Sequence, residues 1–361
     1  MDNTITVLFP KNDKKNITLQ FINVLELAVF EKGLKNVQLN IEYFNNNIEL
    51  ENIILSNSGK GKIYIGPLSS KYTNIAKNYC NKETIFFSFS SDRKIANDCI
   101  FLLNFFPKNE LEQLFKYLDD ESKVALLYPE NEYGYLINGL IDEIINNSNA
   151  ILVNRASYKS NLSNVRNAIK ELGKYELRKY ELKRQKQILI TKDDDRSKKR
   201  LKKLEKFKTT NDYDFTHVFI ADYGLNLLQV APLLPYYDID PNVVQFLTTG
   251  VIDDDSFFFE PSLQGAIFPG VEKNKRLDLL VQYENIYNEN LMRISTLPYD
   301  LVGLLNHIYS KQLSFNQMIE LLNNPSVKFD GVDGKFFFRN NLIERDLDIL
   351  KISNGKANKI N

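Results

Sequence analysis

The stretch KIYIGPLSSKYTNIAKNY, residues 62–79, contains the two halves of a β–α unit. Lys62–Gly66 is a short apolar and aromatic run typical of a buried strand, and Ser69–Tyr79 has apolar residues at helical spacing. The glycine and proline between them mark a turn, and Ser69 or Ser70 can cap the helix that follows. A strand, a tight turn and a capped helix in this order predict a parallel sheet with helices on its faces.

The same alternation recurs along most of the chain. A first series of strands is expected at Ile5–Pro10, Val37–Phe44, Lys62–Gly66, Thr84–Phe89 and Ile100–Phe105. A second series is expected at Lys123–Tyr128, Ala150–Ala156, Thr216–Ala221 and Val243–Leu247. Helical spacing lies between strands at Thr18–Lys32, Ser69–Tyr79, Tyr133–Asn146 and Leu225–Tyr237. Two such series predict an α/β protein with two Rossmann-like lobes.

The pattern changes after residue 265. A short strand, Gly265–Phe268, is followed by two expected helices, Asn274–Asn288 and Leu297–Gln312. The tail Phe329–Ser353 is rich in β-forming residues, and the run Phe336–Phe338 lies between turn signals, which predicts a hairpin.

The segment Glu171–Lys208 is dense in Lys, Arg and Glu, with leucines spaced along it. The acidic triplet Asp193–Asp195 interrupts it, and no helix breaker flanks that triplet. We interpret the segment as a solvated helical hairpin inserted in the second lobe, at about residues 174–208. A basic helical face that binds nucleic acid is the alternative.

The composition limits the possible functions. The 361 residues contain 46 Lys and Arg and 46 Asp and Glu, so the formal net charge is zero and any basic patch is local. This balance argues against a general nucleic-acid binder. No run approaches the 18 or so apolar residues of a membrane helix. The N-terminus lacks the pattern of a signal peptide, which leaves a cytosolic protein or a mature secreted chain.

Few residues of the sequence are candidates for catalysis or metal binding. Cys80 and Cys99 are too few for a zinc site. We expect them to be free thiols, and a bridge that closes a small loop in an oxidising compartment is the alternative. His217 and His307 match no ligand spacing and are interpreted as structural, and Asp253–Asp255 as a polar loop. Neither a phosphate loop nor a Gly-x-Ser-x-Gly elbow is present. We therefore expect no catalytic residues, no metal and no cofactor.

Four segments with polar residues lie where an expected strand ends and a helix begins. In open α/β sheets, ligands bind beyond the carboxyl ends of the strands. Four junctions have this position: Gly66–Ser70, Ser88–Ser91, Glu132–Tyr135 and Ala221–Gly224. A ligand-binding cleft is the expectation.

These junctions resemble type I periplasmic solute-binding proteins of the leucine/isoleucine/valine-binding type. Ile63–Ser70 is similar to the third strand and serine turn of that family, and Tyr133-Gly134 to its tyrosine–glycine turn. The tail Phe329–Phe336, FDGVDGKF, is similar to the family's ending. The resemblance covers essentially the whole chain.

Within that fold, the chain resembles most the penicillin-binding protein activator branch. The residues concerned are Ala231–Tyr237, Thr248–Gly250 and the charged insertion. Two features depart from transport receptors: the loop Lys11–Asn16 lacks glycines, and Val251-Ile252-Asp253 offers no clear acidic partner for an amino-acid ammonium group.

The resemblance implies discontinuous lobes joined by three crossover strands. Lobe one is expected to hold residues 1–106 and 266–328, and lobe two residues 107–265 and 329–361.

The resemblance also implies a function without a chemical step. In the receptor hypothesis, the lobes close over a small polar ligand, an amino acid or a cell-wall fragment, for delivery to an inner-membrane permease. In the alternative, the cleft is vestigial and the protein is an envelope scaffold that activates a peptidoglycan synthase. The expected location is the periplasm, with or without a lipid anchor that this chain does not contain.

Six residues are assigned to the ligand site by this resemblance. Ser69, Ser70, Ser90 and Tyr133 are expected on one side of the cleft. Asp222 and Tyr223 are expected on the other side.

Overall fold

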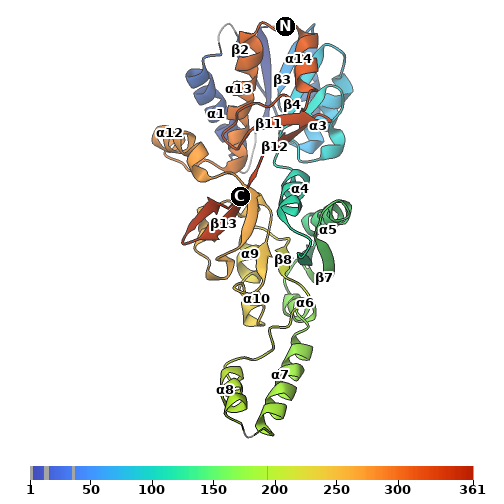
Figure 1. Cartoon of the computed structure of the whole chain (residues 1–361). Helices are drawn as coiled ribbons and strands as arrows, with labels where there is room; N and C mark the ends of the chain where they lie inside the picture. Colours follow the sequence, from blue (N-terminus) through green and yellow to red (C-terminus); the bar gives the residue numbers. More distant parts are fainter. Residues whose placement is uncertain (1–2, 12–15, 35–36, 193, 361) are drawn as a thin grey trace. The chain divides into compact units, whose positions relative to one another are not determined.

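A computed structural model describes residues 3–11, 16–34, 37–192 and 194–360, which divide into two compact units (Figure 1). Unit one contains Met1–Phe106 and Lys273–Asp346. Unit two contains Pro107–Glu272 and Leu347–Asn361. The chain therefore passes between the units three times, as the fold predicted from the sequence requires.

Unit one has a seven-stranded sheet in the order β11-β12-β5-β4-β3-β1-β2. All neighbouring strands are parallel except β11, which pairs antiparallel with β12. The strands are β1 Thr4–Pro10, β2 Gln38–Phe44, β3 Lys62–Ile65, β4 Thr84–Ser88, β5 Ile100–Leu102, β11 Phe336–Arg339 and β12 Leu342–Arg345.

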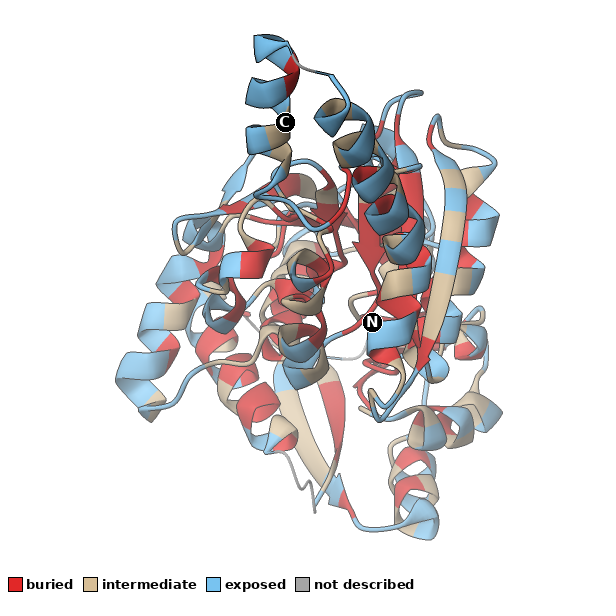
Figure 2. Cartoon of the chain, turned by 90° about the horizontal axis from the view of Figure 1, so that it is seen from below, coloured by how far each residue is buried: buried red, intermediate tan, exposed pale blue. Residues whose placement is uncertain are grey.

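Five helices of unit one contribute apolar residues to the core around this sheet: α1 Ile17–Lys32, α2 Asn47–Ser56, α3 Ser70–Ala76, α13 Leu297–Ser310 and α14 Phe315–Leu322. A sixth, α12 Leu277–Tyr287, contacts α1 through hydrogen bonds of Tyr283 and Tyr287 with Asn23. The strands β4 and β5 are wholly buried, as expected for central parallel strands with helices on both faces. Figure 2 shows this pattern, with buried residues in the strands and along the inner faces of the helices.

Unit two repeats the design with the order β14-β13-β10-β9-β8-β6-β7. Its first five strands along the chain are parallel to one another, and β13 and β14 add an antiparallel edge beside β10. The strands are β6 Lys123–Glu130, β7 Ile151–Lys159, β8 His217–Ile220, β9 Gln245–Leu247, β10 Ile267–Gly270, β13 Asp348–Ser353 and β14 Lys356–Lys359.

The helices of unit two include the charged pair expected from the sequence. They are α4 Pro107–Tyr117, α5 Glu132–Ile145, α6 Val165–Leu172, α7 Tyr175–Ile190, α8 Asp195–Leu204, α9 Gly224–Val230, α10 Leu233–Tyr236 and α11 Asp255–Phe258. The turn between α7 and α8 contains Asp193, which lies outside the described residues. Short 3-10 turns occur at Lys77–Tyr79, Arg93–Ile95, Gly250–Ile252, Pro261–Leu263, Lys273–Arg276 and Arg293–Thr296.

Two lobe boundaries expected from the sequence are wrong. The strand near residue 267, expected in lobe one, is β10 of the second sheet, so the chain leaves unit two after Glu272. The hairpin β11–β12, expected in lobe two, completes the first sheet. Packing explains the second difference, since the Phe338 ring lies 5.3 Å from the Phe101 ring in the core of unit one. The last two strands of the described chain, β13 and β14, belong to unit two.

The expectation of free thiols is also wrong. Cys80 and Cys99 form a disulfide, with their Cα atoms 5.7 Å apart. This separation lies within the ordinary range for a disulfide. Cys80 follows the 3-10 turn after α3 and Cys99 directly precedes β5, so the bridge ties two neighbouring connections of unit one.

None of the helices in the described part of the chain has the length and the apolar run needed to cross a bilayer.

Candidate functional site

The turn after β3 depends on Gly66. This residue has a φ of 100°, and a Cβ atom there would lie 2.4 Å from the carbonyl oxygen of Leu8. Only glycine therefore lets the end of β3 lie so close to β1. The Gly66–Pro67 peptide is cis, and α3 begins at Ser70 with Ser69 as its N-cap.

Hydroxyl groups join the turns that follow β3 and β4. The Ser70 and Ser90 hydroxyls are 2.8 Å apart, and those of Thr73 and Ser88 are 2.7 Å apart. Ser88 also donates to the carbonyl oxygen of Pro67 at 3.0 Å. Ser90 is fully buried, whereas Ser69 is exposed. Ser70 and Ser90 thus hold the two turns together, and Ser69 presents its hydroxyl beside them.

An apolar pocket of about 320 Å³ lies at the same edge of the unit-one sheet. Its lining combines aromatic and aliphatic side chains with two polar ones: Pro10, Ile17, Phe21, Phe44, Asn45, Leu68, Ser69, Tyr72, Phe89 and Ile294. Phe21 and Phe89 meet edge to face with ring centres 4.7 Å apart. Pro10 and Phe44 end β1 and β2, so the pocket opens where the parallel strands finish. A pocket with these residues is suited to an apolar or aromatic group.

The corresponding turn in unit two depends on Gly134. A Cβ atom there would lie 2.0 Å from the carbonyl oxygen of Pro129 in β6, so a side chain cannot fit without a shift of the backbone. The Asn131 side chain caps α5 by accepting a hydrogen bond of 2.8 Å from the Gly134 amide. This close approach fixes the position of Tyr133 at the end of β6.

Tyr133 contacts two other parts of unit two. Its hydroxyl lies 2.6 Å from the Thr249 hydroxyl, and its ring meets the Tyr223 ring edge to face at 5.1 Å. Burial raises the pKa of the Tyr133 phenol above its ordinary value, and the nearby carboxylates of Glu110 and Asp222 add to this shift. The phenol is therefore neutral at physiological pH and can donate a hydrogen bond.

Asp222 is fully buried at the end of β8. Its carboxylate accepts a hydrogen bond of 2.5 Å from the Tyr158 hydroxyl and one of 2.8 Å from the Tyr223 amide. Burial raises the pKa of Asp222. These bonds orient the start of α9, where the Tyr223 side chain is half exposed. Tyr223, unlike Asp222, presents its side chain to solvent.

The structure divides the six predicted site residues differently from the expectation. Ser69, Ser70 and Ser90 lie together in unit one. Tyr133, expected beside the serines, lies in unit two against Tyr223. The reason is that Tyr133 follows β6, whose carboxyl end adjoins that of β8 in the second sheet.

Several residues at these edges were not assigned to the site from the sequence. One is Thr249, which follows β9 and precedes a 3-10 turn. Tyr158 lies within β7, and its role is visible only in the structure, where its hydroxyl donates a hydrogen bond to Asp222. The aromatic lining of the unit-one pocket comes from strand ends that are ordinary core positions in the sequence. Most of the loop Lys11–Asn16, which lacks glycines, lies outside the described residues.

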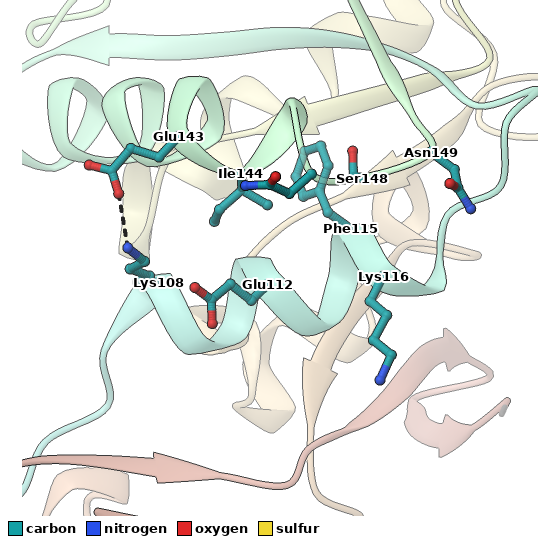
Figure 3. A pocket seen from close by; sticks show the side chains of 9 residues that line it. Lys108, Glu112, Phe115, Lys116, Glu143, Ile144, Ser148 and Asn149 are labelled. Atoms are coloured by element: carbon teal, nitrogen blue, oxygen red, sulfur yellow. Dashed lines mark hydrogen bonds and ion pairs between the residues drawn. The ribbon is translucent and has the colours of Figure 1, made fainter. Parts of the chain in front are cut away.

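A second hollow, of about 390 Å³, lies between α4 and α5 (Figure 3). Lys108 and Glu143 form an ion pair of 3.0 Å across it. Asn147–Asn149, which also line it, precede β7 and so lie at the amino edge of the sheet. This position is opposite to the one at which α/β sheets bind ligands. Among the described residues, no group of three or more His, Cys, Asp or Glu is placed to hold a metal ion.

No family model and no curated protein matches the sequence. Solved structures match over nearly its whole length. A Rhodospirillum rubrum protein described as a candidate branched-chain amino acid ABC transporter has a TM-score of 0.75 at 12% identity, with 99% of each chain covered.

Two other solved structures also match the chain over nearly its whole length. The first is the solute-binding protein of an ABC transporter from Rhodopseudomonas palustris, in complex with 3,4-dihydroxybenzoic acid. It has a TM-score of 0.62 at 11% identity and covers 99% of this chain and 96% of its own. The second is the C-domain of LpoA from Haemophilus influenzae, a regulator of PBP1A. It has a TM-score of 0.64 at 13% identity and covers 99% of this chain and 100% of its own. At such identities the matches define the fold, and the chain therefore has the fold of type I periplasmic binding proteins.

Proposed function

We propose that this protein is a non-catalytic binding protein for a small organic acid with an apolar or aromatic body. The observation that carries the proposal is the apolar pocket at the carboxyl edge of the unit-one sheet. Its aromatic rings suit the body of such a ligand, and Ser69 and Asn45 supply polar atoms beside them. The similar protein from Rhodopseudomonas palustris binds 3,4-dihydroxybenzoic acid, which belongs to this class.

Unit two offers polar groups at the carboxyl edge of its own sheet. The Tyr133 hydroxyl is bonded to that of the fully buried Thr249, and the Tyr133 ring contacts the half-exposed Tyr223. Tyr223 therefore presents a phenol that can donate a hydrogen bond to a ligand. That the two lobes close over the ligand is part of the receptor hypothesis, and we keep it as a proposal.

The proposed location is the periplasm, with delivery of the ligand to an inner-membrane permease. The Cys80–Cys99 disulfide supports an oxidising compartment, since cytosolic proteins rarely keep structural disulfides. The similar Rhodospirillum rubrum protein is described as a branched-chain amino acid transporter candidate, which supports the transport role.

A thermal-shift screen tests the binding proposal. The probes are L-leucine, L-isoleucine, benzoate, 3,4-dihydroxybenzoate and a muramyl dipeptide. A ligand at one hundred times its dissociation constant adds about 2.7 kcal/mol to the free energy of unfolding. We expect an organic acid from this set to raise the melting temperature of the wild type.

A matched pair of variants identifies the pocket. Leu68→Ala, inside the pocket, reduces the shift, whereas Phe30→Ala, on the 88% exposed side chain near the end of α1, leaves it unchanged. A shift that Leu68→Ala leaves intact contradicts the proposed site. Failure of every organic acid contradicts the proposed function.

An envelope scaffold is the second candidate, favoured by one observation. The LpoA C-domain matches this chain from end to end, and it is a regulator of PBP1A. In this alternative the protein engages a peptidoglycan synthase and the pocket is vestigial. Surface plasmon resonance against the purified synthase of the same organism decides between the two: binding without any small-molecule response favours the scaffold.

A further inference from the structure

The helical hairpin of unit two, residues 174–208, is anchored to the α/β layer by hydrogen bonds at its base. The buried Arg178 guanidinium donates to the Gly173 carbonyl at 2.6 Å, to the Thr209 hydroxyl at 2.9 Å and to the Thr210 carbonyl at 2.8 Å. It thus ties together the two points at which the hairpin leaves the α/β layer. Asp194 caps α8 by accepting from the Ser197 amide at 2.9 Å, and α8 packs against α7 (Figure 1).

This hairpin concentrates positive charge. Residues 174–208 include 15 Lys and Arg against 6 Asp and Glu, whereas the whole chain has 46 of each. The hairpin therefore carries a formal charge of +9, and the rest of the chain carries −9. Six of the ten residues of α8 are Lys or Arg, and all six are exposed. Such a field attracts an anionic surface.

Apolar side chains are exposed among these cations. Leu177, Tyr180 and Ile188 are 66%, 68% and 43% exposed and share one face of α7, because they are separated by three and eight residues. Ile190 is 67% exposed beside lysines that line an open hollow of about 550 Å³. Four exposed apolar residues on one 16-residue helix exceed the scattered singles of an ordinary surface.

We propose that the hairpin docks on the surface of a membrane that contains anionic lipids. Lysine and arginine side chains contact the acidic headgroups, and Leu177, Tyr180 and Ile188 enter the boundary between headgroups and acyl chains. Aliphatic side chains favour a lipid surface over a nucleic acid, whose phosphates give them nothing to pack against. The spread of cations around α8 matches a continuous layer of negative charge better than the separate carboxylates of an acidic protein.

Vesicle co-sedimentation tests this proposal on the full chain. We expect binding to vesicles of equal parts phosphatidylglycerol and phosphatidylcholine, no binding to phosphatidylcholine alone, and loss of binding in 0.5 M NaCl, because salt screens these charges. Lys199→Glu/Arg200→Glu/Lys203→Glu weakens binding by at least about a hundredfold, since each cation near the surface contributes about fivefold. The matched control reverses three exposed lysines outside the hairpin, Lys60, Lys82 and Lys116. It binds like the wild type.

The exposed apolar residues of α7 give a second test of the proposal. Leu177→Ser/Ile188→Ser, with unchanged circular dichroism, is expected to weaken vesicle binding about tenfold and to leave binding of a single-stranded oligonucleotide unchanged. Equal vesicle binding by this variant and the wild type contradicts insertion and identifies a general polyanion site. Absence of binding to the anionic vesicles overturns the proposal, whatever the outcome for the ligand pocket.

Discussion

The hydroxyl pair of Tyr133 and Thr249 gives the sharpest test of the geometry in unit two. The two oxygens are 2.6 Å apart, and the Thr249 side chain is fully buried. Tyr133→Phe and Thr249→Val each remove one hydroxyl with little change in shape. The edge-to-face contact between Tyr133 and Tyr223 is kept in both variants.

The expected effects follow from the cost of an unpaired buried group. Each single substitution leaves the other hydroxyl without this partner, and such a loss costs about 1–3 kcal/mol. The second substitution then removes the unpaired group itself. We therefore expect the double variant to be less destabilised than the sum of the two singles, by about 1 kcal/mol or more.

Urea unfolding followed by far-ultraviolet circular dichroism measures this coupling, since the chain has no tryptophan for fluorescence. Equal m-values show that the variants and the wild type expose the same amount of surface on unfolding. Tyr117→Phe, on a tyrosine that is 43% exposed at the end of α4, is the control and changes stability by less than about 0.5 kcal/mol. Strict additivity of the two substitutions would refute the hydroxyl contact.

Three further predictions concern unit one. Gly66→Ala is expected to cost about 2–4 kcal/mol in urea unfolding, because its Cβ meets the Leu8 carbonyl at a positive φ, whereas Gly139→Ala, with open space around it, is neutral or stabilising; equal effects contradict this reasoning. Labelling of the unfolded, unreduced protein is expected to find no reactive thiol, and Cys80→Ser to lower the free energy of unfolding by about 3 kcal/mol; two labelled thiols show that the bridge is absent. Burial raises the pKa of Asp300 to about 6, so the native state binds the extra proton between about pH 4 and 6, and the contribution of Asp300 to stability falls as the pH rises through that window. Wild type measured against Asp300→Asn shows this fall, and a rise over the same range contradicts it.

The sequence predicted the parallel sheets well because their strands are short apolar runs between clear turn signals. The charged hairpin was equally visible, since its leucines lie at helical spacing among cations. The lobe boundaries failed because the side chains of β11 suit either core, and only the packing of Phe338 on Phe101 shows which core they fill.

The candidate site could be predicted only in part, for a different reason. Turn residues such as Gly66 and Gly134 can be recognised because each is a glycine between an apolar strand pattern and a helical pattern. The structure adds the reason, since a side chain there would meet the backbone of another segment. A pocket wall does not, since Phe21 and Phe89 have the character of any core residue. The disulfide also depends on the distance between Cys80 and Cys99 in space, which their sequence separation of 19 does not determine.

The central proposal, a small organic acid bound in the apolar pocket of unit one, is tested most directly by isothermal titration calorimetry with the organic acid that gives the largest thermal shift. We predict one site per chain. Leu68→Ala weakens binding by about 1–3 kcal/mol, the scale for loss of a contact that the ligand buries, and, if the lobes close over the ligand, Tyr223→Ala weakens it on the same scale. The exposed controls Phe30→Ala and Tyr117→Ala retain the wild-type affinity. Affinity that depends on neither Leu68 nor Tyr223 would contradict the account.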